Sequence, residues 1–540
     1  KDGTIFHVSL AEKLLALLLA KLGNFIPEGG IWMNTQRPEW NDGNNALVGK
    51  GISVVTLGYL RRYVVLCRKL FAGTGLEELS ITRELGEQFR AMYATLQKHR
   101  SVLKATFDDF QRRSVMDELG GASSAYRWGY YRQGLSGQFA GLGKADLLAF
   151  LDLVLEYIEH SLKANERPDG LFHAYNVLHV ADGKASIGHL TEMLEGQVAI
   201  LSSGLLNGGQ ALGVLRSLRA SRMYRPDQNS YSLYPDRDLA GFFRKNQISA
   251  DQVRGLKLVA ELVERNDRTV IVRDENGVYH FNGAFRNARD LRHALEALRQ
   301  QDGYAHLVEA ESGKLLDLFE AVFDHHSFTG RSGTFFAYEG LGSIYWHMVS
   351  KLLLAAEESC LRAAADGEPA ETVRALADCY TEIRQGLGFN KSPQVYGAFP
   401  TDPYSHTPAG QGAKQPGMTG QVKEEILARW AELGLDVEQG ALTFRPFLLD
   451  GRETLQAAEV FEYLDVHGLD QTVELPAGSL AYTFCQVAVV YRPGPEEKLE
   501  VSLADGTVRS IPGRDLDAES SRWVFERNGR IKQITVFRPA

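Results

Sequence analysis

The chain has 540 residues, with 59 Lys and Arg against 68 Asp and Glu, and a formal net charge of −9 at pH 7. Charges of both signs are interspersed, so no basic patch typical of nucleic-acid or anionic-membrane binding is expected. The four cysteines lie far apart without a CxxC pair, which argues against a zinc knot or a dense disulfide framework. We expect a soluble protein and leave its compartment, cytoplasm or periplasm, open.

Apolar residues recur at three- to four-residue spacing from about residue 8 to 465, which predicts mainly α-helical structure. The first apolar run, Leu14 to Leu22, is too short to span a bilayer. The chain does not begin with Met, and we expect further residues before Lys1. Helices are expected near 8–22, 46–72, 77–98, 101–118, 144–164, 190–204, 209–220, 249–265, 288–301, 313–324, 341–365, 369–386, 420–434 and 453–463.

Long loops rich in polar and aromatic residues separate these helices, at 23–45, 120–142, 165–189, 222–248, 325–340 and 387–419. Loops longer than about 12–15 residues are uncommon unless they are functional. Paired helices with such loops predict an (α/α)6 toroid or barrel. An inserted β-hairpin is expected at about 268–282, because β-branched runs flank Asn276-Gly277.

The C-terminal part changes to alternating strands separated by Gly, Pro and Asp turns. Strands are expected at 480–491, 499–503, 507–511, 521–526 and 531–537. We therefore expect a helical catalytic domain at 1–465 and a C-terminal antiparallel β-sandwich-like domain at 466–540.

The segment 39–45, Glu-Trp-Asn-Asp-Gly-Asn-Asn, places two carboxylates, an indole and three amides in a loop that leads into a helix. Carboxylates act as general acids or bases, carboxamides bind pairs of hydroxyls, and an aromatic face covers a sugar ring. We interpret Glu39 as a general acid assisted by Asp42, although these residue types also form turns and helix caps. The expected sugar contacts here are Arg37, Trp40, Asn41 and Asn44.

A second cluster lies at 325–340, where hydroxyl residues and an arginine are flanked by glycines before a helix. Such a segment favours phosphate or carboxylate, because backbone N–H groups and a guanidinium both bind anions. Glu339 is instead suited to act as the base of a hydrolase, and a purely structural turn is the alternative. The histidines have no metal-binding spacing. The predicted phosphate ligands are His326, Thr329, Arg331 and Ser332.

A third loop, at 390–421, alternates aromatic rings with amides and hydroxyls and leads into a helix that carries Glu424. Glu424 is either a first-turn carboxylate or the second catalytic group. Two further loops and the segment 126–132 have a similar composition. The predicted substrate contacts from these segments are Trp128, Tyr175, Tyr231, Asp236, Arg237, Tyr396, Asp402, Tyr404, His406 and Gln415.

The segment 39–45 resembles the Asp-Trp-Asn-Asp-Gly/Cys stretch of the cellobiose and chitobiose phosphorylase family, in which position 39 aligns with the general acid. The stretch 329–333 is similar to the family's Thr-Gly-Ser loop on the phosphate side. The resemblance implies an inverting enzyme on an (α/α)6 barrel and extends to glucoamylase-like hydrolases. Glu replaces the family's Asp at position 39, and Arg331 is an addition.

These observations predict inverting cleavage of a glycosidic bond in an oligosaccharide or glycan, by hydrolysis or by phosphorolysis with inorganic phosphate as co-substrate. No other cofactor, no metal, no nucleic acid and no membrane is expected, since Walker and Rossmann motifs are absent from the sequence. A homodimer is compatible with the sequence. One alternative is a polysaccharide lyase using Tyr404 with His406, or Tyr175 with His173, as base and acid. Another is a non-catalytic glycan-binding subunit.

Overall fold

The computed structural model describes residues 5–34, 47–236, 241–323, 342–400, 402–416 and 419–539. The chain divides into two compact units, Lys1–Met418 and Thr419–Ala540, so the division falls earlier than the boundary expected at 465. Within the described ranges, none of the helices has the length and apolar content required to cross a membrane.

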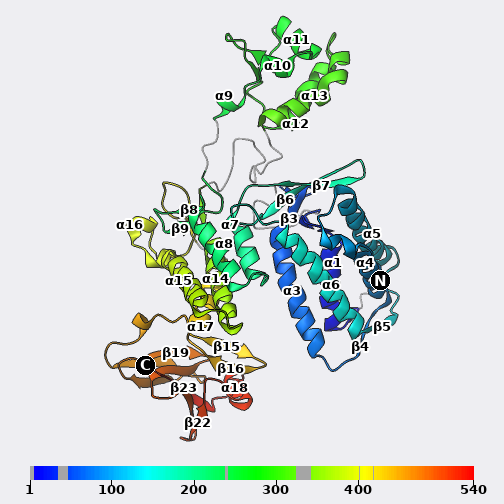
Figure 1. Cartoon of the computed structure of the whole chain (residues 1–540). Helices are drawn as coiled ribbons and strands as arrows, with labels where there is room; N and C mark the ends of the chain where they lie inside the picture. Colours follow the sequence, from blue (N-terminus) through cyan, green and yellow to red (C-terminus); the bar gives the residue numbers. More distant parts are fainter. Residues whose placement is uncertain are drawn as a thin grey trace. The chain divides into compact units, whose positions relative to one another are not determined.

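Helices dominate the first unit (Figure 1). Side-chain caps define several of their starts: in α5, Asp108 and Gln111 form a reciprocal capping box, and Ser53 accepts from the amide of Thr56 at the start of α3. The helices outside the segment 241–323 are α1 (Leu10–Leu22), α3 (Val54–Gly73), α4 (Arg83–His99), η1 (Arg100–Lys104), α5 (Asp109–Gln133), α6 (Lys144–Lys163), α7 (Leu194–Ser202), α8 (Gly208–Ala220), α14 (Trp346–Ala365), α15 (Ala370–Gln385), η2 (Gly388–Asn390) and α16 (Pro393–Tyr396).

Helices α3 and α6 are antiparallel, because the guanidinium of Arg61 binds Glu159 at 2.7 Å and Arg68, about two turns further along α3, binds Asp152. Helix α7 instead runs parallel to α3. Gly58 faces Ala199, and Arg61 donates to the carbonyl of Ser203 at 2.9 Å.

Helix α14 runs in the same direction as α3 and α7. Its C-terminal end lies near the residues that follow α7, since a Cβ on Gly208 would lie 2.8 Å from Ala363. Arg62 of α3 binds Glu358 of α14 through both nitrogens, at 2.5 and 2.7 Å. The three helices α3, α7 and α14 therefore begin at a common end.

A five-stranded sheet, in the order β1-β2-β3-β6-β7, leads into this end. All its pairs are antiparallel, and β3 pairs with β6 through Gly51–Val177, Ile52–Asn176 and Ser53–Tyr175. The strands of the first unit outside 241–323 are β1 (Phe25–Ile26), β2 (Gly30–Trp32), β3 (Gly51–Ser53), β4 (Glu78–Thr82), β5 (Phe139–Gly143), β6 (Tyr175–Ala181), β7 (Lys184–His189), β8 (Tyr224–Arg225), β9 (Ser230–Tyr231), β12 (Ile344–Tyr345), β13 (Tyr404–Thr407) and β14 (Lys414–Pro416).

Helix α5 differs from the sequence prediction. A helix at 101–118 and a loop at 120–142 were expected, but α5 continues to Gln133. The close contact here is at Ser123, because a Cβ on Gly23, in the turn after α1, would lie 2.5 Å from the Cβ of Ser123. The predicted end of the helix was wrong, since α5 continues through the small residues 120–124, and Trp128 consequently lies on a helix.

The segment 241–323 has its own core of buried apolar side chains. Buried Glu311 accepts from the backbone amides of Lys257 and Leu258, at 3.0 and 2.8 Å, and so caps α11. The segment expected to form a hairpin contains two strands that pair antiparallel. The elements are α9 (Phe242–Lys245), α10 (Ala250–Val253), α11 (Lys257–Glu264), β10 (Ile271–Arg273), β11 (Tyr279–Phe281), α12 (Ala288–Arg299) and α13 (Ala305–Phe323).

The second unit contains a five-stranded sheet in the order β19-β20-β23-β21-β22, in which β20 and β23 are parallel. Its apolar face forms one core with β15, β16 and α18. The elements are α17 (Thr419–Glu432), β15 (Leu435–Glu438), β16 (Ala441–Phe444), η3 (Gly451–Glu453), β17 (Glu459–Leu464), β18 (Asp470–Leu475), β19 (Leu480–Phe484), β20 (Val487–Pro493), β21 (Lys498–Leu503), β22 (Val508–Pro512), α18 (Ala518–Phe525) and β23 (Ile531–Arg538).

Two local predictions in the second unit were wrong. The helix expected at 453–463 does not form: residues 459–463 belong to strand β17, because the aromatic and β-branched residues there pair with β18. The strand expected at 521–526 is helix α18, since Asp517 caps it by accepting from the amide of Ser520 at 2.8 Å.

Candidate functional site

The starts of α3, α7 and α14 are connected by backbone hydrogen bonds. The amide of Val54 donates to Ala174 at 3.0 Å, and the amide of Leu194 donates to Leu233 at 3.0 Å. Leu233 in turn donates to Ser343 at 2.8 Å, just before α14. Strands and loops from four parts of the sequence therefore meet where three parallel helices begin. The first amides of α3 and α7 are thus already paired, but the partial positive charge of a helix N-terminus still favours a nearby anion.

An apolar cluster fixes this meeting point; we refer to it as the helix-start cluster. Its buried members are Leu47, Val55, Ala174, Tyr175, Val177, Met193, Ala199 and Tyr234, with Met33, Leu190 and Leu233 packed against them.

The helix-start cluster holds the flanks of both predicted catalytic segments. Met33 and Leu47 lie on either side of 35–46, and the amide of Met33 donates to Gly51 at 2.9 Å. Gly342, which follows 324–341, donates to the carbonyl of Tyr234 at 3.3 Å. The two segments therefore join the described chain at the same cluster.

A buried carboxylate lies beside this cluster. Glu195, in the first turn of α7, is 7 % exposed and accepts a hydrogen bond from the hydroxyl of Tyr175 at 2.8 Å. The sequence analysis did not single out Glu195. All nine residues of α7 are buried, and Glu195 is a carboxylate among them. A charged group in a buried helix needs specific partners, and this pattern could have pointed to Glu195.

Tyr175→Phe removes the donor and leaves the buried carboxylate of Glu195 without that hydrogen bond. We expect the free energy of unfolding to fall by about 1.5–3 kcal/mol, the usual contribution of a hydrogen bond to a charged group. Thermal unfolding measures the change. Tyr231→Phe is the matched control, because Tyr231 is also buried and its hydroxyl has no hydrogen-bond partner among the described residues. Equal losses in both variants would contradict the role of the Tyr175 hydroxyl.

Two imidazoles stack beside the five-stranded sheet: His173 precedes β6, and His189 is the last residue of β7. The rings of His173 and His189 are 4.2 Å apart with an interplanar angle of 12°. His189 Nδ1 lies 2.8 Å from the buried amide oxygen of Asn176, and His173 Nδ1 lies 3.2 Å from the carbonyl of Leu190. Burial, and secondarily the neighbouring His189, lowers the pKa of His173 to about 4. Both rings are therefore neutral at pH 7.

The lowered pKa of His173 predicts a pH dependence of stability. An unfolded histidine binds a proton near pH 6.5, whereas folded His173 resists protonation until about pH 4. Stability is therefore complete above pH 6.5 and decreases as the pH falls from 6.5 toward 4. We expect His173→Asn to flatten this decrease in denaturation curves recorded from pH 7 to pH 4. His179→Asn, at an exposed histidine of β6, serves as control and should keep the wild-type slope.

Aromatic and cationic groups gather at the start of α14. The rings of Tyr345 and His406 stack at 4.9 Å, and the indole of buried Trp346 donates to the hydroxyl of Thr407 at 2.9 Å. The ammonium of Lys391 lies 4.3 Å from the centre of the Trp346 ring. Burial, and then the nearby charge of Arg225, lowers the pKa of Lys391 to about 7. Lys391 was noted in the third loop but was not predicted as a site residue.

Part of the predicted site lies outside the described residues, so the structure assigns it no geometry. This part comprises Arg37, Glu39, Trp40, Asn41, Asp42, Asn44, Arg237, His326, Thr329, Arg331, Ser332 and Glu339.

The other predicted contacts lie in several places. Near the helix starts are Tyr175, Asp236 beside Gly342, and His406 on β13 with Tyr404. Tyr231 and Tyr396 are buried, and Tyr396 packs edge-on against Trp346.

The remaining predicted residues are more peripheral. Asp402 and Gln415 are exposed, and Gln415 accepts from the hydroxyl of Ser405 at 3.0 Å. Trp128 lies on the C-terminal half of α5. Glu424 is buried in α17 and belongs to the second unit. Among the residues described, no group of three or more His, Cys, Asp or Glu side chains is arranged to hold a metal ion.

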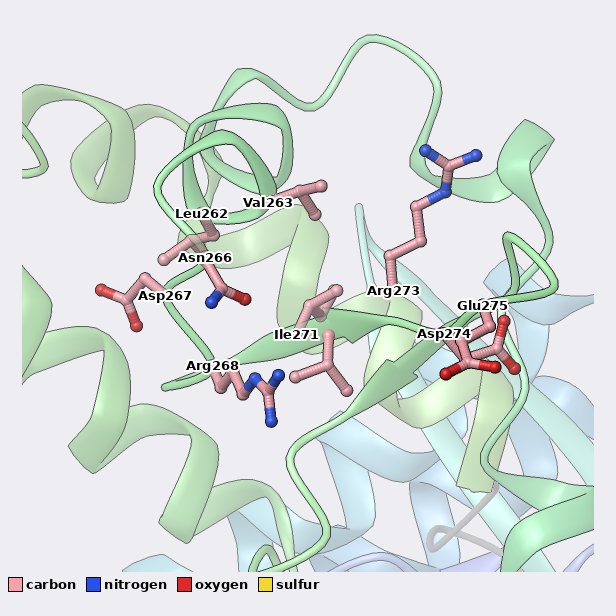
Figure 2. Close-up of a pocket in the computed structure, with 10 residues that line it drawn as sticks. Leu262, Val263, Asn266, Asp267, Arg268, Ile271, Arg273, Asp274 and Glu275 are labelled. Carbon is pink, nitrogen blue, oxygen red and sulfur yellow. The ribbon is translucent and has the colours of Figure 1, made fainter.

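A pocket of about 350 Å³ lies in the segment 241–323, between the end of α11 and strand β10 (Figure 2). Figure 2 shows Arg268 and Arg273 extending in different directions, while Asp274 and Glu275 lie together at the turn of the hairpin. The carboxylate of Asp274 accepts hydrogen bonds from the backbone amides of Asn276 and Val278. The charged groups therefore do not converge on one ligand, and we do not take this pocket as the active site.

Comparison with known families gives a match to one part of the chain. Residues 239–326 match the family model of the GH149 phosphorylase insertion domain 2. This match supports a glycoside phosphorylase-like family and indicates a glycoside phosphorylase-type enzyme; it does not distinguish the cellobiose and chitobiose phosphorylases or the glucoamylase-like hydrolases. No curated protein matches the chain.

Proposed function

We propose that the chain cleaves a glycosidic bond of an oligosaccharide by phosphorolysis with inversion, at the common end of α3, α7 and α14. The match of residues 239–326 to a phosphorylase insertion domain carries the phosphorolytic assignment. The convergence of three helix N-termini supports it, because such an end favours a phosphate anion.

In the proposed reaction, inorganic phosphate attacks the anomeric carbon from the face opposite the leaving sugar. The bond between that carbon and the glycosidic oxygen breaks, and Glu39 gives its proton to the departing oxygen. The products are a sugar 1-phosphate of inverted configuration and a shortened oligosaccharide. Asp42 assists Glu39, and Thr329, Arg331, Ser332 and His326 bind the phosphate. If water attacks instead, Glu339 serves as base.

The anchoring of the two segments supports this assignment of roles. The segment 35–46 is flanked by Met33 and Leu47, which belong to the helix-start cluster. The segment 324–341 is followed by Gly342, which donates to Tyr234 of the same cluster. A donor at Glu39 and an anion site at 329–332 would thereby be tethered to one small region. We further propose that the parallel helices α3, α7 and α14 are inner helices of an (α/α)6 toroid, with α6 and α15 among the outer ones.

The test is incubation with a panel of β-linked oligoglucosides, with and without inorganic phosphate. We expect sugar 1-phosphate to accumulate with equimolar loss of phosphate, and we expect no cleavage without phosphate. Release of free sugar without phosphate would favour a hydrolase. An unsaturated product absorbing in the ultraviolet from a uronate polymer would favour a lyase, and saturable binding without turnover would favour a glycan-binding subunit. Any of these three results would contradict phosphorolysis.

A further inference from the structure

A group of charged and amide side chains gathers beside the first residue of α14; we refer to it as the Lys391 cluster. Lys391 directly follows η2, and its ammonium lies 4.3 Å from the centre of the Trp346 ring and 3.4 Å from the amide oxygen of Gln228. The charges of Arg225 and Asp227 both act on Lys391. The cluster consists of Arg225, Asp227, Gln228, Trp346 and Lys391.

The Lys391 cluster adjoins the end of the predicted phosphate segment. The guanidinium of Arg225 donates to the carbonyl of Gly342 at 3.2 Å and to the carbonyl of Thr407 at 2.9 Å. Gly342 is the first described residue after 324–341, and Thr407 lies on β13, which pairs with β12 just before α14. Lys391 is therefore held close to the helix starts at which we place the reaction.

The positive charge of the cluster is not balanced. Arg225 binds the carboxylate of Asp227 at 3.1 and 2.5 Å, so the one acidic side chain of the cluster is already paired. Over the described ranges of the chain, no Asp or Glu forms an ion pair with Lys391. Two cations and a single carboxylate therefore lie together in a partly buried place.

The ammonium of Lys391 also has unused hydrogen-bonding capacity. The amide nitrogen of Gln228 donates to the carbonyl of Val395 at 2.7 Å, which turns the amide oxygen toward Lys391. The resulting distance of 3.4 Å is long for a charge-assisted hydrogen bond. An ammonium has three N–H donors, so two of them have no acceptor among the described residues.

The contacts of Lys391 within the protein do not replace the water that its ammonium loses. A cation over an aromatic face and a hydrogen bond to an amide oxygen both favour the charged form. The pKa of Lys391 is nevertheless lowered to about 7, by burial and then by the charge of Arg225, against the opposing effect of Asp227. The uncharged Trp346 covers the amine from α14. An external anion would restore the charged form.

Inorganic phosphate meets these requirements. A dianion supplies the missing negative charge and several acceptor oxygens for the N–H donors of Lys391, whereas a neutral sugar supplies no charge. We propose that Lys391 is a ligand of inorganic phosphate in the proposed active site, and that its neutral amine takes up a proton from solvent as phosphate binds. The ammonium formed in this way donates to a phosphate oxygen. This role rests on the proposed function, which makes phosphate the co-substrate.

The test is calorimetric titration of the full chain with inorganic phosphate at pH 8, where free phosphate is already largely the dianion. Heats measured in two buffers with different enthalpies of ionisation give the number of protons taken up. We expect the wild type to take up about one proton per phosphate, because most Lys391 side chains are neutral at this pH and become charged in the complex.

Two variants separate the charge from the proton uptake. Lys391→Met should weaken phosphate binding about 10- to 100-fold, the usual effect of losing a hydrogen bond to a charged group, and should abolish the uptake. Lys391→Arg keeps a permanent cation beside Trp346 and should bind phosphate without taking up a proton. Lys144→Met is the control, because Lys144 is also partly buried but donates to the carbonyl of Thr74, outside the cluster. It should keep the affinity and the uptake of the wild type.

Equal phosphate affinity in Lys391→Met and the wild type, unchanged proton uptake in Lys391→Arg, or no phosphate binding by the wild type would overturn the proposal. The rate of sugar 1-phosphate release by the same proteins tests the proposed function separately. Release by the wild type, with an unchanged KM for phosphate in Lys391→Met, would contradict the role of Lys391 alone. Phosphate binding that depends on Lys391 but leads to no turnover would support this role and contradict phosphorolysis.

Discussion

Glu39→Gln is expected to lower the rate of phosphorolysis by about 10²–10⁴-fold, the usual contribution of general acid catalysis. Glutamine keeps the size and the hydrogen-bonding capacity of the side chain but cannot give a proton to the departing oxygen. Binding of oligosaccharide should be little affected, so the loss should appear in kcat rather than in KM. Initial rates of sugar 1-phosphate release measure it.

A substrate with a better leaving group distinguishes the acid from a structural residue. When the departing oxygen needs no proton, as in an aryl glycoside with an acidic phenol, the variant should recover much of its rate. Glu77→Gln is the control, since the side chain of Glu77 is 89 % exposed and pairs only loosely with Lys144 at 3.7 Å. Wild-type activity in Glu39→Gln, or an equal loss on both substrates, would rule out the assignment.

Arg112→Met is expected to destabilise the sheet that leads into the helix starts by about 3–5 kcal/mol, the typical cost of breaking a buried ion pair from one side. Arg112 is 7 % exposed and donates to the carboxylate of Glu28 at 2.7 Å. It also donates to the carbonyls of Phe107, Pro27 and Ala185. Its removal leaves the buried charge of Glu28 and three carbonyls without this partner.

The loss should be local, so native-state hydrogen exchange at amides of β6 and β7 is the appropriate measurement. Arg113→Met provides a matched control one residue along α5. Arg113 pairs with Asp117, whose side chain is 54 % exposed, and this change should stay within about 0.5 kcal/mol. Similar protection in the two variants would show that the Arg112 network does not hold the sheet.

The spacing of apolar residues predicted helices well where the apolar stripe of the helix is also the face that packs in the core. Helices α6, α14 and α15 begin and end close to the expected residues, because each has an apolar stripe between polar or glycine-containing boundaries. The extension of α5 to Gln133 was missed. In this stretch Ser123 packs closely against Gly23 in the turn after α1, and a contact between residues so far apart in the sequence has no local signal.

Only part of the candidate site could be predicted from the sequence, because contacts between residues far apart in the chain have no local signal. Composition indicated Tyr175 and His406, since aromatic rings among amides and hydroxyls are typical of saccharide loops. It could not show that Tyr175 donates to Glu195, which is 20 residues away on another element. Composition also placed Trp128 among the substrate contacts, on a segment expected to be a loop, whereas the structure places it on helix α5 with 55 % of its surface exposed.

A crystal structure of Glu39→Gln with a bound oligosaccharide and phosphate would test the central claim most directly. We expect the phosphate and the scissile bond at the common start of α3, α7 and α14, with the side chain of residue 39 within hydrogen-bonding distance of the glycosidic oxygen. The account would be contradicted if residue 39 pointed into bulk solvent, or if sugar and phosphate bound away from these three helix starts.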